Sequence, residues 1–278
     1  HLFSSAASDV YKRQNPTCGK RFDSIGVEST EENRRDYREM LFRSKGMNGN
    51  IGGVILFDET IRQSAKDGTL LRDIILNQGA LPGIKVDKGL QPIEDCAGET
   101  VTIGLDGLDE RLKEYSSMGA KFTKWRAVIN IGDEIPSDKC IDANMQALAD
   151  YAKCAQDNGM VPIVEPEVLM DGEHSIDDCY AATDRSLKSL FDHLEKNNIN
   201  IKGTLLKPNM VTSGKDSNDQ AGIDEVAKKT LECLIKNVPA ELPGITFLSG
   251  GQSDVLATAH LNAMNKICLL YTSPSPRD

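Results

Sequence analysis

The sequence lacks paired cysteines, long apolar runs and clustered histidines, and each absence excludes a class of protein. Its seven cysteines contain no Cys-x-x-Cys pair, so free thiols in a reducing compartment are favoured over disulfides or a zinc site. No apolar run reaches the roughly 18 residues of a membrane-spanning helix. The four histidines show no metal-ligand spacing, so no metal centre is expected.

Basic residues are outnumbered, because 32 lysines and arginines face 42 aspartates and glutamates, for a formal charge of −10. This balance argues against a nucleic acid or an anionic membrane as a partner. Aromatic residues make up only 5% of the chain, and aliphatic residues dominate the apolar set, which suits an α/β protein. A length of 278 residues allows one large domain or two small ones.

The two ends of the chain differ in character from the middle. Residues 1–14 and 268–278 resemble translated adapter sequence, and the alternative for each is an ordinary disordered terminus. We therefore expect one folded domain at 15–267, with both ends outside it.

Apolar strands and amphipathic helices alternate along this domain. The expected strands cover residues 52–57, 84–87, 122–129, 161–169, 203–207 and 245–249. The expected helices cover residues 30–42, 105–118, 143–158, 176–196, 224–237 and 254–265. Ser29 and Glu32 have the spacing of a capping box at the start of the first helix. Continuously apolar strands separated by helices predict a parallel sheet that helices cover.

Two parallel architectures fit this alternation, a (β/α)8 barrel and a doubly wound sheet. No Gly-x-Gly-x-x-Gly turn follows the first strand, which weakens the dinucleotide-binding alternative. Charged residues recur in or at the ends of strands, several as i, i+2 pairs that face one side of the sheet. Buried charges are costly unless they converge on one polar site, and the mouth of a barrel provides that convergence. We therefore predict a (β/α)8 TIM barrel.

Lys207 is the central candidate. It directly follows an apolar strand, and Pro208 has no N–H with which to continue the strand. Desolvation of an ammonium favours the neutral amine, which is the form that attacks a carbonyl to make a Schiff base. A strand-end lysine that extends to solvent is the alternative.

Six motifs along the chain together resemble class I fructose-bisphosphate aldolase. They are Gly-Ile-Lys-Val-Asp-Lys-Gly (83–89), Gly-Leu-Asp-Gly-Leu (104–108), Lys-Trp-Arg (124–126), Val-Pro-Ile-Val-Glu-Pro-Glu (161–167), Leu-Leu-Lys-Pro-Asn-Met-Val (205–211) and Phe-Leu-Ser-Gly-Gly-Gln-Ser (247–253). The resemblance implies a barrel lyase of glycolysis that needs no metal or other cofactor. Such an enzyme cleaves fructose 1,6-bisphosphate reversibly to dihydroxyacetone phosphate and glyceraldehyde 3-phosphate.

The resemblance also implies catalytic roles for four residues. Lys207 matches the family's Schiff-base lysine, and Glu165 matches its general acid/base for imine formation. Glu167 is similar to the carboxylate that supports the site. Lys124 matches the lysine beside the Schiff-base position, where a second cation favours the neutral amine of Lys207.

A substrate with a phosphate at each end needs two anion sites. Ser249, Gly250 and Gly251 end a strand just before a helix, where backbone N–H groups can approach a phosphate, and they match the family's phosphate loop. The other positions that match the family's substrate cleft are Arg21, Lys85, Arg126 and Arg35. For Arg35, a solvated helix charge is an equally supported alternative.

The sequence departs from the family at both ends. Lys12 stands where the family has the aspartate that takes part in C–C cleavage, and the eighth strand, with its phosphate-binding arginine, has no counterpart. We therefore expect a barrel whose first and last strands are missing or replaced. The polypeptide as written is expected to be unstable or to aggregate and to have little activity.

The resemblance implies a homotetramer in the full-length parent, a sugar phosphate as the small-molecule partner, and a cytoplasmic location with the plastid as an alternative. A different class of function also stays open. The chain could be a non-catalytic, aldolase-like scaffold that binds sugar phosphates or cytoskeletal partners.

Overall fold

The structure is a computed structural model that describes residues 7–8 and 15–272, with side chains described from 18 to 268. Its helices are α1 (Asn15–Asp23), α2 (Glu31–Phe42), α3 (Asp58–Arg62), α4 (Leu71–Asn77), α5 (Leu108–Ser117), α6 (Asp138–Asp157), α7 (Ile176–Lys196), α8 (Ile223–Asn237) and α9 (Asp254–Thr272). Its strands are β1 (Ala7–Ser8), β2 (Gly53–Leu56), β3 (Leu81–Lys85), β4 (Leu90–Pro92), β5 (Thr100–Thr102), β6 (Phe122–Ile129), β7 (Val161–Val168) and β8 (Leu205–Leu206).

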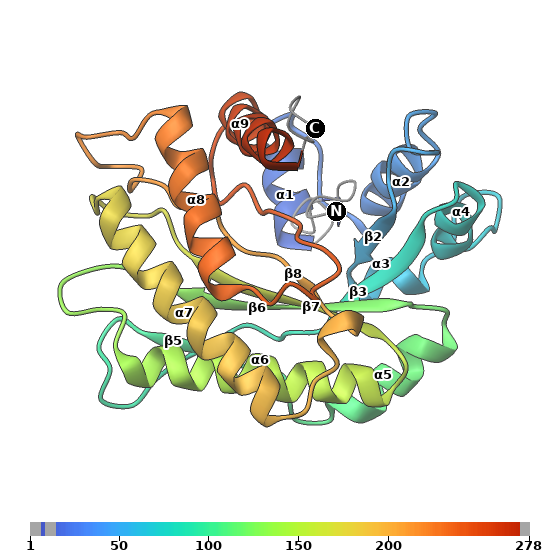
Figure 1. Ribbon diagram of the computed structural model, residues 1–278. Helices are drawn as coiled ribbons and strands as arrows, with labels where there is room; N and C mark the ends of the chain where they lie inside the picture. Colours follow the sequence, from blue (N-terminus) through green and yellow to red (C-terminus); the bar gives the residue numbers. More distant parts are fainter. Residues whose placement is uncertain (1–6, 9–14, 273–278) are drawn as a thin grey trace, which may run out of the picture.

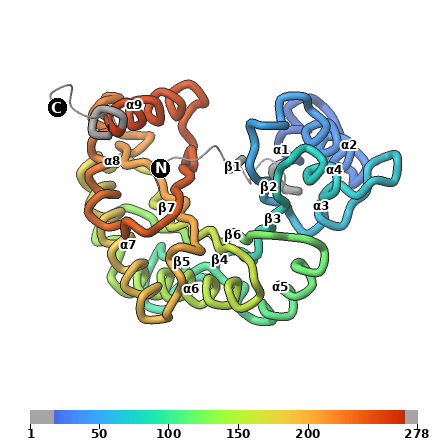
Figure 2. The backbone as a smooth tube through the Cα atoms, turned by 45° about the vertical axis from the view of Figure 1, so that its right-hand side comes forward, coloured from blue at the N-terminus to red at the C-terminus, as the bar shows by residue number. Residues whose placement is uncertain are grey.

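Six strands form one parallel sheet in the order β1-β2-β3-β6-β7-β8. A further segment extends it, because Ile245 bridges Leu206 in parallel and the Thr246 N–H donates to the Leu206 carbonyl at 2.9 Å. The helices lie outside the sheet, which curves round so that its two ends approach each other (Figures 1 and 2). This arrangement confirms the predicted α/β TIM-barrel class.

The register of β6 against β7 explains why charges gather inside the barrel. Arg126 is paired with Glu165 and Lys124 with Ile163, while on the other side Lys85 of β3 is paired with Lys124. Because side chains alternate between the two faces of a strand, these charged residues share the inner face. Residues Thr123, Trp125 and Ala127 face the helices instead.

Inside the barrel, an apolar layer lies below the charged one. Ile55, Phe122 and Ile163 are buried there as a cluster separate from the main core, and Leu205 packs against them. Gly83 makes room for this layer, since a Cβ on Gly83 would lie only 2.3 Å from the Phe122 ring. The charged side chains therefore have dry packing on the side away from the barrel mouth.

The outer core joins the helices to the sheet. The Tyr151 ring of α6 stacks on Trp125 of β6 with centroids 5.5 Å apart, and its hydroxyl lies 2.7 Å from Thr123 Oγ1. Helix α7 begins with a capping box in which Ser175 and Asp178 bond each other's backbone, so its start is locally determined. These contacts hold β6 and β7, which carry most of the charged residues.

Several local expectations differ from the structure. Thr30, and not Ser29, caps α2 and accepts from the Asn33 N–H. Helix α6 begins at Asp138, five residues before its expected start, because Ser137 caps it. The sequence prediction also omitted α1, α3, α4 and the antiparallel β4–β5 pair, which are short elements without a sustained apolar period.

The ends of the sheet also differ from expectation in part. Ala7 and Ser8 pair in parallel with Gly53 and Val54, so two residues of the expected tail occupy the place of a first strand. Helix α9 continues to Thr272, past the expected boundary at 267. The position of Lys12, where the family has an aspartate, lies outside the described residues.

Candidate active site

Lys207 lies at the carboxyl end of β8, as the sequence predicted. Its backbone N–H continues the sheet pattern by donating to the Val164 carbonyl at 2.8 Å, and Pro208 follows. The side chain turns into the barrel and is only 3% exposed. The alternative of a lysine that extends to solvent is therefore wrong.

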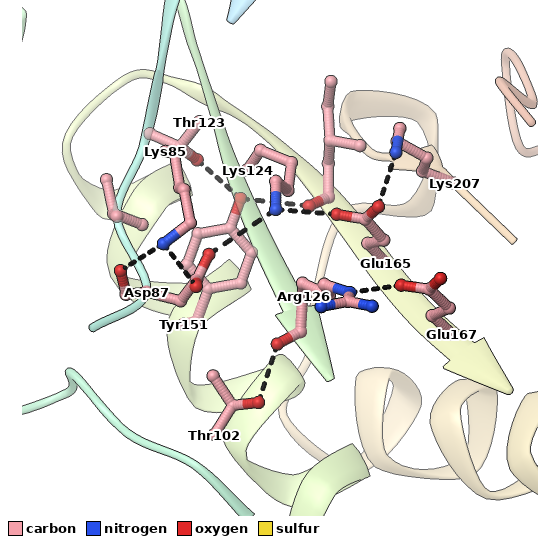
Figure 3. Close-up of polar contacts among 12 residues, drawn as sticks. Lys85, Asp87, Thr102, Thr123, Lys124, Arg126, Tyr151, Glu165, Glu167 and Lys207 are labelled. Atoms are coloured by element: carbon pink, nitrogen blue, oxygen red, sulfur yellow. Dashed lines mark hydrogen bonds and ion pairs between the residues drawn. The ribbon is translucent and has the colours of Figure 1, made fainter. Parts of the chain in front are cut away.

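Glu165 of β7 joins Lys207 to Lys124. Its Oε1 lies 2.5 Å from Lys207 Nζ and its Oε2 lies 2.7 Å from Lys124 Nζ. Glu165 and Lys124 are both 0% exposed. One carboxylate thus bridges two buried ammonium groups (Figure 3).

The line of charges continues on the other side of Lys124. Asp87 follows β3, and its Oδ2 lies 3.6 Å from Lys124 Nζ while its Oδ1 lies 2.6 Å from Lys85 Nζ. Lys85 also donates to the Asp87 backbone carbonyl at 2.8 Å. The order is therefore Lys85, Asp87, Lys124, Glu165 and Lys207, with signs that alternate and a net charge of +1 when all five are ionised.

The electrostatics of this line favour ionised groups despite the burial. Burial alone would raise the pKa of Glu165, but the ammonium groups of Lys124 and Lys207 outweigh it and hold that pKa below its ordinary value. Burial would likewise lower the pKa of Lys124, but the carboxylates of Glu165 and Asp87 raise it above its ordinary value. Lys124 is thus a stable cation beside Lys207.

Arg126 and Glu167 form a second pair nearer the mouth. The Arg126 Nε donates to Glu167 Oε2, and the Glu167 side chain is 5% exposed against 25% for Arg126. The Arg126 backbone carbonyl accepts from Thr102 Oγ1 of β5 at 2.7 Å. A partly exposed guanidinium at the mouth is placed to meet an anion from solvent.

The glycine loop lies beside β8. The Leu248 N–H donates to the Pro208 carbonyl at 3.2 Å, which aligns residues 245–248 with the strand that carries Lys207. Gly250 and Gly251 follow with φ of 64° and 101°, a backbone conformation that side chains disfavour. Ser249 is exposed, and α9 begins three residues after Gly251, so loop N–H groups and a helix start face the same region.

Two predicted binding residues are placed differently. Arg21 of α1 donates to the Tyr37 hydroxyl at 3.2 Å. Arg35 of α2 pairs with Asp36 at 2.6 Å and with Glu32 at 3.3 Å. Their contacts thus lie between and along α1 and α2 rather than in the line of charges, and a substrate role for either stays a prediction.

Asp87 is the residue whose connection the sequence prediction missed. Its i, i+2 spacing from Lys85 indicated a shared face, but the contact with Lys124 depends on the pairing of β3 with β6.

Among residues 18–268 and the described backbone beyond them, no group of three His, Cys, Asp or Glu side chains could hold a metal ion. No helix in the described part of the chain is long and apolar enough to cross a membrane.

The chain is similar in sequence and in structure to known proteins. The class-I fructose-bisphosphate aldolase family matches residues 10–273. A probable fructose-bisphosphate aldolase class 1 of Xylella fastidiosa is 57% identical over 251 residues, which are 90% of this chain and 75% of that protein. Cytosolic fructose-bisphosphate aldolase 4 of Arabidopsis thaliana is 49% identical over 90% of this chain and 64% of its own length.

A solved structure shares the fold. It is fructose-bisphosphate aldolase from Plasmodium falciparum in a ternary complex with TRAP and a small-molecule inhibitor. The two superpose with a TM-score of 0.90 and 42% sequence identity, over 99% of this chain and 76% of the other.

Proposed function

This chain belongs to the class I fructose-bisphosphate aldolase family, and from this we propose how its own residues carry out the reaction. The protein is a lyase, and its reaction is the reversible cleavage of fructose 1,6-bisphosphate to dihydroxyacetone phosphate and glyceraldehyde 3-phosphate, a step of glycolysis. Lys207 is the residue that forms the Schiff base.

The observation that carries this assignment is the bridging of Lys207 and Lys124 by Glu165. At 2.5 Å, the Lys207 ammonium can pass a proton to Glu165 and become a nucleophilic amine. The amine adds to the substrate ketone to give a carbinolamine. Glu165 then returns a proton to the departing hydroxyl, so that water leaves and a protonated imine forms.

The imine then accepts the electrons of the bond that breaks. Glu165, which is ionised again once the hydroxyl has left, takes the proton of the C4 hydroxyl; the C3–C4 bond then cleaves, glyceraldehyde 3-phosphate leaves, and the electron pair moves into the imine to give an enamine. Glu165 returns that proton to the enamine carbon, and hydrolysis of the resulting imine releases dihydroxyacetone phosphate and free Lys207. Lys124 stays charged and balances the negative charge of Glu165 whenever Glu165 is ionised.

Phosphate binding is assigned to groups at the mouth of the barrel. Lys85 and Arg126 are cations on the inner face that keep some exposure. Ser249, Gly250 and Gly251 provide backbone donors on the opposite side of Lys207. Two separated anion sites suit a substrate with a phosphate at each end.

The non-catalytic scaffold is the weaker alternative because of what the barrel buries. Removing an ammonium or carboxylate from water costs several kcal/mol for each ion, and Lys124, Glu165 and Lys207 are almost wholly buried. A scaffold that only binds sugar phosphates needs exposed cations and no buried carboxylate between two lysines. A chemical role explains the burial better.

The test is reductive trapping. Borohydride added with dihydroxyacetone phosphate should reduce the imine and leave a stable adduct, which peptide mass spectrometry would locate on Lys207. The Lys207→Arg variant keeps the positive charge and should give no adduct at this position. An unmodified Lys207 in a folded version that spans the full length of its relatives would rule out the Schiff-base assignment.

Location and assembly are also proposals. A cytoplasmic location is supported by a relative named as cytosolic and by seven free cysteines, with the plastid as the alternative. The homotetramer is supported only by membership in the family. Cell fractionation and sedimentation of the full-length parent protein would test the two points.

A further inference from the structure

Asp87 is a buried carboxylate that the proposed reaction does not use. Its side chain is 7% exposed, and it contacts Lys85 at 2.6 Å and Lys124 at 3.6 Å. Lys207 lies on the far side of Lys124 and Glu165 from Asp87 (Figure 3). Asp87 therefore acts on one of the two lysines that share Glu165 much more strongly than on the other.

This asymmetry matters because Lys124 and Lys207 both contact Glu165. They share one carboxylate, so a proton lost from the pair belongs to both until something distinguishes them. When the pair holds one proton, it can lie on Lys124, which leaves Lys207 as the amine, or on Lys207, which leaves it unreactive. Glu165 alone favours neither state, since its two contacts differ by only 0.2 Å, from 2.5 Å to 2.7 Å.

We propose that Asp87 is a positioning residue that keeps the shared proton on Lys124 and so leaves Lys207 as the free amine. The attraction between the Asp87 carboxylate and the Lys124 ammonium stabilises the reactive arrangement of the pair. This inference rests on the proposed function, because it assigns the reacting amine to Lys207.

Other charged groups around Lys124 do not supply the same bias. The described charged groups that surround it are Glu165 of β7, Asp87 after β3, Lys85 of β3, Arg126 of β6 and Lys207 after β8. Of these, Asp87 and Glu165 are the carboxylates. Glu165 contacts both lysines, so among these groups Asp87 is the carboxylate that distinguishes them.

The position of Asp87 is held by contacts that do not involve the Lys124 side chain. Lys85 binds both the side chain and the backbone carbonyl of Asp87. The preceding Val86 donates its N–H to the Lys124 carbonyl at 3.1 Å and accepts from Arg111 Nη1 at 2.9 Å. The carboxylate is thus fixed beside Lys124 before any substrate enters.

The test is the pH profile of reductive trapping in the Asp87→Asn variant. Asparagine has the same shape as aspartate without its charge, so the single proton should spread over both lysines and the maximal trapping rate on Lys207 should fall. Lys124 should also lose its proton more easily. The alkaline limb of the profile, where the trapping rate changes as Lys124 loses its proton, should therefore move to lower pH by about one unit. A variant that only disturbs packing would lower the rate without moving the limb.

Matched variants separate the explanations. Asp87→Glu keeps the charge and should restore the wild-type alkaline limb. Asp109→Asn makes the same chemical change at an exposed helix carboxylate that pairs with Lys113, and its profile should match the wild type. Asp87→Ser removes the same charge with a different side chain and should show the same shift as Asp87→Asn.

The two neutral variants make the proposal falsifiable even if one of them does not fold. An alkaline limb that coincides with the wild type in either Asp87→Asn or Asp87→Ser would overturn it. Wild-type trapping on Lys207 tests the proposed function separately. If the wild type forms the adduct and the limb of the neutral variants does not move, the Schiff-base assignment stands and the role of Asp87 falls.

Discussion

Replacing Glu165 by glutamine tests the electrostatic reasoning most directly. The substitution keeps the shape of the side chain but leaves Lys124 and Lys207 without their common counter-ion. Both contacts are short, at 2.7 Å and 2.5 Å, and the carboxylate is 0% exposed. Removing one partner from a buried ion pair costs about 3–5 kcal/mol, a large part of the roughly 5–15 kcal/mol that stabilises a typical domain.

We therefore expect Glu165→Gln to lower the melting temperature at neutral pH by about 10 °C, since each kcal/mol moves the midpoint of a large domain by about 2–4 °C. Calorimetry or circular dichroism would measure the midpoint, and urea unfolding would give the free energy. The matched control is Glu114→Gln, which removes a carboxylate that pairs with Arg62 at 2.6 Å but is 46% exposed. Water screens that pair, so its loss should change the midpoint little.

A second substitution distinguishes lost charge balance from lost packing. Combining Glu165→Gln with Lys124→Met removes one charge of each sign, so the double variant should recover much of the stability that Glu165→Gln loses. The reasoning from buried charges is refuted if Glu165→Gln has the same melting temperature as Glu114→Gln. It is also refuted if the loss of unfolding free energy in the double variant equals the sum of the losses in Glu165→Gln and Lys124→Met.

Two further predictions concern packing and pH. Gly83→Ala should destabilise the protein by about 1–3 kcal/mol, because its Cβ would meet the Phe122 ring at 2.3 Å. Gly46→Ala, whose Cβ meets nothing within 4 Å, is the control. Equal free energies of unfolding for the two variants would contradict the close packing of Phe122 on Gly83. The lowered pKa of Glu165 stabilises the fold above the pKa of an unfolded glutamate, about 4.3, and this stability is lost as pH falls through the pKa of Glu165 in the folded protein. The raised pKa of Lys124 stabilises the fold below the pKa of an unfolded lysine, about 10.4, and this stability is lost as pH rises through the pKa of Lys124 in the folded protein. The contribution of Glu165 and Lys124 to the free energy of unfolding, measured in urea as the difference between wild type and the variant without both charges, should be constant between these two pH limits. A contribution that declines between the limits would show that one of the two pKa shifts has the wrong sign.

Much of the fold and several site residues follow from local sequence alone. The period of the apolar residues located α7 at its observed bounds because the Ser175 cap and the helix face are both local features. The end of β8 was predictable because Pro208 has no N–H for the sheet. The i, i+2 spacing of Glu165 and Glu167 placed both on one face, since side chains alternate along any strand.

The tertiary structure alone decided which charges meet. The sequence places Lys85, Lys124, Glu165 and Lys207 on separate strands, and nothing local indicates that Glu165 contacts two lysines or that Asp87 reaches Lys124. Those contacts depend on the register between neighbouring strands, and a slip of one residue would turn every side chain to the other face. Arg21 and Arg35 lie on helices and not on strands, and their observed partners, Tyr37 and Asp36, both belong to α2.

The sequence by itself thus determined most of the longer elements, the barrel class and the residue types that the chemistry needs, because strand ends and periodicity act over a few neighbouring residues. Only the folded chain determined the alternating line from Lys85 to Lys207. Charge pairing is a property of distance in space, and strand register sets that distance between residues that lie far apart in the chain.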